Sequence, residues 1–401
     1  MPISTTSIEP LSVADYLASY QASSSLFASP STSILAQGAA LSCRTNNRDG
    51  QLLARIRQLL HQAERDGLKQ PIILGAIPFN PHKNGFFRVP RSYELAGPLH
   101  RSSSAGRLLS SNTVQQHRLI PSGAHYEQIV SSGLRTMAEQ HISKLVLARG
   151  LQIDLEQALD RHTVLSNMLQ SNPAGYTYCL PLERDEHHPD PETFLGASPE
   201  LLIKRIGDQV MVNPLAGTCA RDPRPDVDQA QAQQLLQSDK DRREHAFVID
   251  EVVRILQLYC TDLQIPTGPS LTHTRNLWHL STHISGRLRQ PHVSSLELAL
   301  AMHPTPAVCG TPTHLAMQAI EQLEPVDRQL FAGAIGWSDA AGNGEWAVAI
   351  RCAHYRERTL TLSAGAGIVP GSEPALERLE TGNKLMTLLS ALGLTTTIDT
   401  L

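Results

Sequence analysis

The chain has 401 residues, of which 41% are hydrophobic, and its formal net charge is −4. A near-neutral chain with 4% aromatic residues has no basic stripe, so its composition argues against a nucleic-acid-binding protein. No apolar stretch of about 18 residues could span a membrane, and no signal-peptide pattern is found. Six cysteines without CxxC spacing indicate reduced thiols, so we expect a cytoplasmic protein.

The first third of the chain contains few clear elements. Residues 1–45 are rich in Ser, Ala and Thr and predict an irregular opening of the folded domain. Apolar spacing predicts an amphipathic helix over 49–67, a buried strand over 70–81 and a helix over 125–142. The polar stretch 96–123 is expected to be a long surface connection.

Strand patterns dominate after residue 143. Hairpin signals separate the strands, and the helices lie in runs of their own, which predicts an α+β fold with antiparallel sheets rather than βαβ winding. The expected strand regions are 144–155, 174–182, 194–218 and 346–369, and the expected helices are 228–261, 294–301, 312–323 and 374–392.

Two of the predicted helices begin with pairs of acids. "DRREHAFVID" carries Asp241 and Glu244, and "ERLETGNKL" carries Glu377 and Glu380. The simpler interpretations are acids that favour the positive end of a helix dipole, and a surface ion pair between Glu380 and Lys384. If the two helix starts face each other, their carboxylates would suit a hard cation such as Mg²⁺.

Two further charged residues border apolar strands. Glu200 in "GASPELL" lies where burial would raise a carboxyl pKa and make it a general acid; the alternative is an exposed acid in a turn. Lys144 heads "KLVLARG", where burial beside other cations would free its amine to act as a base. The alternative is a lysine that snorkels to solvent at a strand end.

Small-residue loops and an arginine would suit an anionic ligand. The loops 214–221 and 363–374 can bring backbone N–H groups close to a carboxylate, although ordinary turns explain them equally well. Arg351 lies in an apolar strand pattern, and a buried arginine needs an anionic partner. His279 and His283 would share a strand face but lack the spacing of a zinc site.

Taken together, these motifs resemble the chorismate-utilising enzyme family, and within it the isochorismate synthases. The resemblance runs from about residue 70 to the C-terminus, while the first 70 residues match only loosely. It implies large antiparallel β-sheets packed face to face with helices on the outside. It also implies a single chorismate-binding domain over 1–401, in which 1–120 are less typical and 121–401 form the catalytic core. The resemblance rests on "GAIPFNP", "KLVLARG", "LGASPELL", "PLAGTCAR", "DRREHAFV", "LWHL", "HPTPAVCG", "DRQLFAGAIGW", "GNGEWAVAIRCA", "AGAGIVPGSEP" and "ETGNKL".

The resemblance also implies a magnesium site and a reaction. Glu244 and Glu380 would bind Mg²⁺ directly, Asp241 and Glu377 would hold its waters, and the metal would take the ring carboxylate of chorismate. Water would attack C2, the ring double bonds would shift, and the C4 hydroxyl would leave. Two residues would move the protons, with Lys144 as the base that activates water and Glu200 as the acid.

The remaining roles concern substrate binding. Arg351 would clamp the enolpyruvyl carboxylate, while Lys384 and the amides of 365–368 would hold the ring carboxylate. Gly217 would let the backbone approach the substrate, and His279 would orient it. The substrate-binding set implied in this way is Gly217, His279, Ala307, Arg351, Gly365, Gly367 and Lys384.

Two positions narrow the expected activity. Lys144 implies water as the nucleophile, which argues against ammonia-using anthranilate- or aminodeoxychorismate-type enzymes and against a glutaminase subunit. Ala307 stands where pyruvate-releasing relatives often carry threonine, which argues less strongly against a salicylate synthase. We expect the chain to produce isochorismate for the biosynthesis of a siderophore made from 2,3-dihydroxybenzoate or salicylate. A menaquinone-pathway enzyme is an alternative.

An inactive paralogue that binds a carboxylated metabolite is the alternative from another class of protein. It is disfavoured because the base, the acid and the metal-binding acids are all present. Chorismate is the one partner expected, and we expect a monomer. Three cysteines fall within the pocket motifs and have no expected role beyond that of small buried side chains: Cys219, Cys309 and Cys352.

Overall fold

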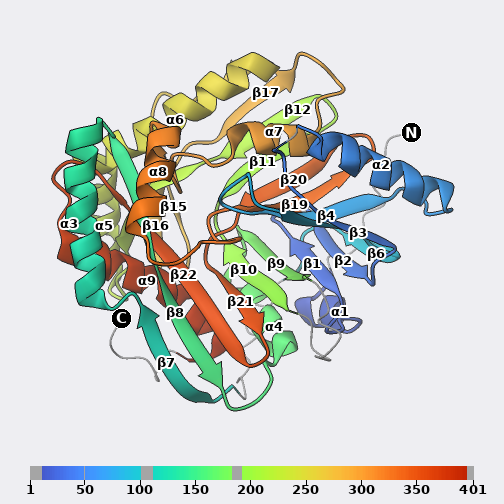
Figure 1. Cartoon of the computed structure of the whole chain (residues 1–401), viewed down its shortest axis with the longest axis horizontal. Coiled ribbons are helices and arrows are strands. Elements are labelled where there is room, and N and C mark those ends of the chain that lie inside the picture. Colours follow the sequence, from blue (N-terminus) through green and yellow to red (C-terminus); the bar gives the residue numbers. More distant parts are fainter. Residues whose placement is uncertain (1–10, 49, 101–111, 183–191, 395–401) are drawn as a thin grey trace.

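The computed structural model describes residues 11–48, 50–100, 112–182 and 192–394. In these ranges the chain forms two large antiparallel sheets, a small third sheet and surrounding helices (Figure 1). One core cluster joins residues of both large sheets, such as Phe27 and Trp346, so the sheets pack face to face as the sequence predicts. The α+β class expected from the sequence is therefore confirmed.

The first large sheet has ten strands, and β8 and β22 form its longest pair. Helices α3 and α9 pack on these two strands (Figure 1). In spatial order its strands are β18 (Gly310–Thr311), β8 (Lys144–Leu155), β22 (Thr359–Ile368), β21 (Cys352–Arg356), β10 (Thr193–Ser198), β9 (Tyr176–Pro181), β1 (Ser25–Ala28), β2 (Ser33–Gln37) and β6 (Ser92–Ala96), with β7 (Val114–Ile120) paired to β8.

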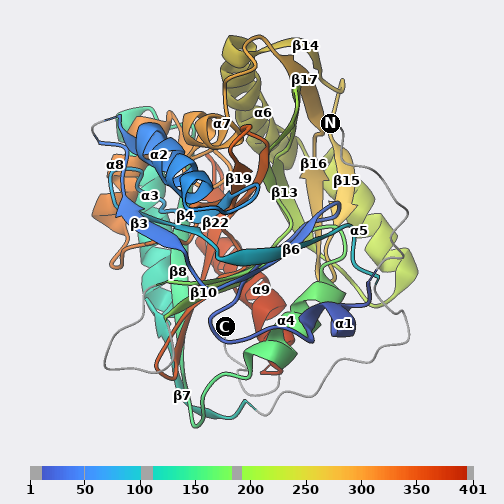
Figure 2. The same cartoon turned by 90° about the vertical axis from the view of Figure 1, so that its right-hand side faces the viewer.

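The second large sheet has nine strands, and the third has three. The small sheet lies at one side of the molecule, covered by α5 (Figure 2). The nine strands are β14 (Cys260–Gln264), β17 (Ile284–Leu288), β12 (Gln209–Asn213), β11 (Leu201–Ile206), β20 (Gly344–Val348), β19 (Ala334–Asp339), β4 (Ile72–Ile77), β5 (Gly85–Val89) and β3 (Leu41–Thr45), and the small sheet consists of β13 (Leu215–Ala220), β16 (Leu277–Ser281) and β15 (Ser270–His273).

The helices of the described ranges lie mostly outside the sheets (Figures 1 and 2). None of them is long and apolar enough to cross a membrane. They are α1 (Val13–Leu17), α2 (Leu52–Arg65), α3 (Gly123–Gln140), α4 (Arg161–Ser171), α5 (Pro225–Gln237), α6 (Asp239–Tyr259), α7 (Ser295–Met302), α8 (Thr313–Leu323) and α9 (Pro374–Leu392).

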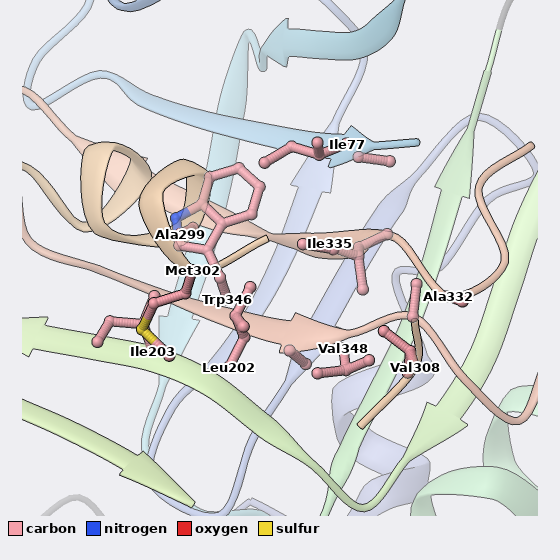
Figure 3. Close-up of a cluster of buried hydrophobic side chains, with 14 of the residues drawn as sticks. Ile77, Leu202, Ile203, Ala299, Met302, Val308, Ala332, Ile335, Trp346 and Val348 are labelled. Atoms are coloured by element: carbon pink, nitrogen blue, oxygen red, sulfur yellow. The ribbon is translucent and has the colours of Figure 1, made fainter. Parts of the chain in front are cut away.

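Trp346 lies among the buried side chains of the larger core cluster (Figure 3). The side chain is fully buried, and its indole N–H donates to Ser338 Oγ at 3.2 Å, so burial of the ring leaves no unpaired donor. The same cluster continues through Val348 to Val308 and Ala332, which form part of a pocket wall. The core therefore reaches one wall of that pocket.

Three expectations about secondary structure are wrong. The described part of 1–45, from residue 11 onwards, is not irregular, because β1, β2 and β3 pair within the large sheets. Ser25 of β1 and Ser33 of β2 are almost fully buried, so a polar composition hid strands whose environment is set by tertiary packing. The stretch 96–123 contains β7, a mostly exposed strand that pairs with β8 through its backbone. Residues 101–111 of that stretch lie outside the described residues.

The third correction concerns the region 228–261, which the sequence predicts as helical throughout. It forms two helices, α5 and α6, that meet at Ser238. The Ser238 side chain accepts from the Asp241 N–H at 3.2 Å and caps α6. The helical pattern is continuous because both segments are amphipathic, but the cap starts a new helix. The first acid pair therefore stands in the opening turns of α6.

Candidate active site

A pocket opens where α6, α9 and β22 meet β13 and β16. The open space between its lining residues, including solvent at the mouth, is about 620 Å³. Most of the residues predicted to bind substrate or metal line this pocket, as does the predicted general acid. Those that do are Glu200, Gly217, Glu244, His279, Ala307, Arg351, Gly365, Gly367, Glu380 and Lys384.

The two predicted acid pairs come together at this pocket. Glu244 of α6 and Glu380 of α9 line it, while Asp241 and Glu377, one turn earlier on the same helices, do not. Burial, followed by the charge of Glu380, raises the pKa of Glu377. Burial also raises the pKa of Asp241, and the charges of Glu244 and Glu380 add to the effect. The acids of the two helix starts are thus close enough to influence each other.

Lysines pair with three of these carboxylates. Lys144 is fully buried, and its Nζ lies 3.1 Å from Glu244 Oε1. Lys384 Nζ donates to the Glu380 carboxylate and to the Gly365 carbonyl at 2.8 Å. Lys240, which the sequence analysis did not single out, lies 3.1 Å from Glu377 and links the two helix starts.

Two sequence-based interpretations change at this point. Lys144 does not snorkel to solvent, and the charged group in contact with it is a carboxylate rather than other cations. The i,i+4 pair of Glu380 and Lys384 exists, but it lies in the pocket and engages a backbone carbonyl of β22. The pair is therefore part of the site and not only a surface contact.

The four acids of the two helix starts are the candidate ligands for a divalent cation. Within the described ranges, no three His, Cys, Asp or Glu side chains are arranged around one point as metal ligands. Three of the acids contact lysines instead. Burial and the repulsion between neighbouring carboxylates raise the pKa values of Asp241 and Glu377. Such a cluster of anionic oxygen donors nevertheless suits Mg²⁺. The residues fit the ion if the carboxylates give up their contacts with the lysines and bind the ion instead.

Glu200 is a buried acid at the pocket wall. Only 3% of the residue is exposed, so the interpretation as an exposed turn acid is wrong. Burial raises its pKa to about 7, although the Leu215 N–H, which donates to Oε1 at 3.4 Å, and nearby cations oppose the rise. A carboxyl with this pKa retains a proton near neutrality and has the property required of a general acid.

Arg351 supplies a positive charge to the pocket. It joins β20 to β21 with a positive φ of 52°, and only 6% of the residue is exposed. Burial lowers its pKa to about 10, so it remains charged at neutral pH. Its Nε has no hydrogen-bond partner within the described residues. A buried guanidinium with an open donor is suited to an anionic ligand.

His279 presents one ring nitrogen for binding. Its Nδ1 lies 3.1 Å from Thr218 Oγ1, and its buried Nε2 has no partner in the described part of the chain. Burial, followed by the charges of Arg351 and Lys384, lowers its pKa well below the usual value, so the ring is neutral. His283 does not share this face, because it is exposed beyond the end of β16.

Glycines keep the space open on two sides. Gly217 has a φ of 80°, and a Cβ there would lie 3.1 Å from the Asp241 side chain. A Cβ on Gly367 would lie 2.3 Å from Glu244 Oε1 and 3.1 Å from Lys144 Cε. A Cβ at either position would press on these charged side chains, so the small-residue loops do more than form turns.

The wall opposite the charged groups is apolar and was not predicted residue by residue. The wall residues fall within the motifs of the family resemblance, but nothing in a single sequence separates a wall residue from a core residue. The wall residues are Val146, Val308, Phe331, Ala332 and Ile350.

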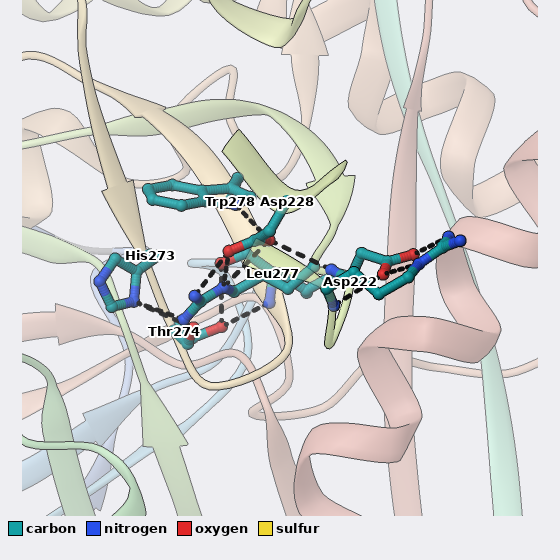
Figure 4. A network of polar contacts seen from close by, with 8 residues as sticks. Asp222, Asp228, His273, Thr274, Leu277 and Trp278 are labelled. Carbon is teal, nitrogen blue, oxygen red and sulfur yellow. Dashed lines mark hydrogen bonds and ion pairs between the residues drawn. The ribbon is translucent and has the colours of Figure 1, made fainter. Parts of the chain in front are cut away.

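A polar network fixes the small sheet behind β13. Asp228 of α5 accepts from Arg221 Nη2 at 2.7 Å and from the Trp278 indole at 2.8 Å (Figure 4). These bonds hold β16 and the end of β13 against α5. Gly217 belongs to β13 and His279 to β16. The network therefore supports two pocket residues from outside.

The cysteines of the pocket motifs do not line the pocket. Cys352 Sγ lies 3.5 Å from Ala349 O, and Cys219 Sγ lies 3.7 Å from Gln231 O. Burial raises the pKa of both thiols, and that of Cys309 to about 12. They are protonated, small packing residues.

A pocket with clustered carboxylates, a protonated acid and an open arginine, set between antiparallel sheets, belongs to an enzyme that binds a small anionic molecule. The chain belongs to the chorismate binding enzyme family, whose sequence pattern matches residues 95–393. This confirms the resemblance drawn from the motifs.

Three relatives match nearly the whole chain. Isochorismate synthase DhbC of Bacillus subtilis is 42% identical over 380 residues, which cover 93% of this chain and 94% of the relative. The vibriobactin-specific isochorismate synthase of Vibrio cholerae is 39% identical over 374 residues, covering 92% and 91%. The crystal structure of the 2,3-dihydroxybenzoate-specific isochorismate synthase DhbC from Bacillus anthracis superposes with a TM-score of 0.89 at 39% identity, covering 95% of this chain and all of that one.

Proposed function

We propose that this chain is an isochorismate synthase that converts chorismate to isochorismate for siderophore biosynthesis, with Mg²⁺ as its cofactor. The observation that carries the proposal is a single pocket that combines Glu200, an acid with a pKa of about 7, with clustered carboxylates and the open guanidinium of Arg351. Relatives of about 40% identity carry this activity in their names.

Substrate binding uses the charged groups of the pocket. The open donor of Arg351 would hold the enolpyruvyl carboxylate, and Lys384 with the backbone of Gly365 and Gly367 would hold the ring carboxylate. The free Nε2 of His279 would orient the ring. Glu244 and Glu380 would hold Mg²⁺, and Asp241 and Glu377 would hold its waters; the ion would supply positive charge to bind the ring carboxylate.

The reaction exchanges one hydroxyl for another, so its protons must balance. Lys144, as the neutral amine, would take a proton from the water that attacks C2, and the ring double bonds would shift. Glu200 would give its proton to the departing C4 hydroxyl, which leaves as water. Both proton carriers are buried, which keeps bulk water from competing with them.

The names of the relatives favour the siderophore pathway over the menaquinone pathway, since one is vibriobactin-specific and another 2,3-dihydroxybenzoate-specific. Ala307 lines the pocket with a methyl group, which supports an enzyme that stops at isochorismate rather than a salicylate synthase. The free state of all six cysteines supports a cytoplasmic location, and we propose that the chain acts without a glutaminase subunit.

Product analysis tests the proposal. Purified protein would be incubated with chorismate, with and without Mg²⁺, and the products would be resolved by chromatography. We expect isochorismate as the first product, its loss with EDTA and its return with excess Mg²⁺. Salicylate and pyruvate as initial products would instead establish the salicylate synthase. Binding of chorismate without turnover would establish the inactive paralogue.

A further inference from the structure

One edge of β8 is incompletely paired within its sheet. β22 pairs along the opposite edge from Leu145 to Asp154. On the incomplete edge, β18 pairs at Lys144 and Leu145, and β7 pairs from Gly150 onwards. Between β18 and β7, no described strand covers the edge.

The Cys309 carbonyl accepts from the Val146 N–H at 2.8 Å, and two charged side chains fill the rest of this gap. Arg328 Nη2 donates to the Val146 carbonyl at 2.7 Å, and the Ala148 N–H donates to Glu324 Oε1 at 2.7 Å. Arg328 and Glu324 also bond to each other through two pairs of atoms, with Nε to Oε2 at 2.9 Å, and their side chains are only 3% and 4% exposed. The ion pair thus replaces a stretch of strand along β8.

The same guanidinium reaches two other segments of the pocket wall. Arg328 Nη1 donates to the Val308 carbonyl at 2.8 Å, and the guanidinium lies 5.9 Å from the ring centroid of Phe331. On another side it lies 4.3 Å from the ring centroid of Phe79. Val146, Val308 and Phe331 line the pocket, while Arg328 itself does not. One buried side chain therefore bonds to two wall segments that are far apart in the sequence, at Val146 and Val308, and contacts a third wall residue near it in the chain.

We propose that Arg328 and Glu324 are positioning residues for the reaction: they fix the apolar wall and the segment of β8 that begins with Lys144. The inference rests on the proposed function. Ion pairs of this kind contribute little net stability compared with apolar residues of similar size, so a geometric role is the better account of a pair placed here. Misplacement of reacting groups by about 1 Å can cost on the order of 10²-fold in rate.

The substitution Arg328→Lys tests this role. Lysine keeps the charge but cannot bond to both carbonyls and to both carboxylate oxygens at once. We expect kcat to fall on the order of 10²-fold, with KM for chorismate changed by less than about threefold, because the groups that bind the carboxylates are untouched.

Arg205→Lys is the matched control. Arg205 is also a buried arginine that donates to three carbonyls, those of Gly207, Pro291 and Ala341, and none of these residues lines the pocket. Thermal unfolding of both variants would be followed by circular dichroism, and rates would be expressed per folded protein. Both substitutions should lower Tm, but Arg205→Lys should leave kcat within about twofold of the wild type.

The outcomes separate this inference from the proposed function. Isochorismate formation by the wild type sustains the function; if Arg328→Lys then behaves like Arg205→Lys, the pair is only structural and the inference is overturned. If Arg328→Lys does not fold, Glu324→Gln decides, because it keeps the shape and an acceptor for Ala148. It should lower kcat about tenfold at unchanged KM, and an unchanged kcat overturns the inference. A wild type without isochorismate synthase activity overturns both.

Discussion

Glu200 is the residue whose chemistry depends most directly on burial. An ordinary glutamate is ionised at neutral pH, whereas burial raises the pKa of this carboxyl to about 7. The protonated form is the one that can serve a leaving hydroxyl. It predominates below pH 7 and disappears as the pH rises above it.

The activity of the wild type should therefore decrease on the alkaline side of its pH profile. We expect kcat/KM to decrease as the pH rises through about 7, because the free enzyme loses its proton donor. Glu200→Gln should lower kcat by about 10²- to 10⁴-fold and remove this alkaline limb. Steady-state rates from pH 5.5 to 9 would be measured for both proteins. An identical limb in Glu200→Gln would assign the titration to another group.

Lys144 is the second residue with a specific expectation. We expect Lys144→Ala to lower kcat by about 10²- to 10⁴-fold, because the attacking water loses its base, while chorismate binding by equilibrium dialysis persists. Lys204→Ala is the matched control, since Lys204 pairs with the buried Glu345 at 3.6 Å and neither residue lines the pocket. Undiminished turnover in Lys144→Ala would refute the base assignment.

At the scale of elements, a side chain of α6 lies against β22 at a position where the strand has a glycine. Gly367 of β22 pairs in register with Val146 of β8, and a Cβ on it would overlap the Glu244 carboxylate of α6. Neither element can move aside easily, because β22 is bonded along most of its length to β8. The glycine therefore leaves the Glu244 carboxylate its place beside β22.

Gly367→Ala should displace Glu244 and Lys144 together. We expect activity to fall at least about 10²-fold, since both the proposed metal ligand and the proposed base shift. Gly97→Ala is a suitable control, because a Cβ at Gly97 meets nothing within 4 Å and its φ is not positive. Isochorismate formation and Tm would be compared for both variants. Full activity in Gly367→Ala would show that the close approach is not required.

The elements differ in how far the sequence predicts them. The spacing of apolar residues is sufficient for α2, α3 and β8, whose patterns are long and regular. It fails for β1, β2 and β7, because buried serines and an exposed polar edge carry no alternation. The acid pairs were found at their helix starts, but the contact of Lys144 with Glu244 joins residues a hundred positions apart. No local pattern encodes such a pairing.

At the scale of the whole molecule, the N-terminal strands and the C-terminal helix belong to one unit. Strands β1, β2 and β6 share a sheet with β8 and β22, and α9 packs on β22. We propose that the chain folds as one domain, with the division near residue 120 marking sequence divergence rather than a separate body. Correct folding of this unit brings the starts of α6 and α9 together at the pocket.

This convergence predicts that Mg²⁺ stabilises the folded chain, because the ion gathers carboxylates that the unfolded chain keeps apart. At a hundredfold excess over Kd, the free energy of unfolding should rise by about 2.7 kcal/mol, and Tm should rise with Mg²⁺ concentration. Scanning calorimetry without chorismate would measure this, with NaCl added to equalise ionic strength. Glu380→Gln removes a proposed ligand and should abolish most of the rise. A Tm that does not respond to Mg²⁺ in the wild type, or that rises equally in Glu380→Gln, would contradict the site, because binding to the folded state must appear in its stability.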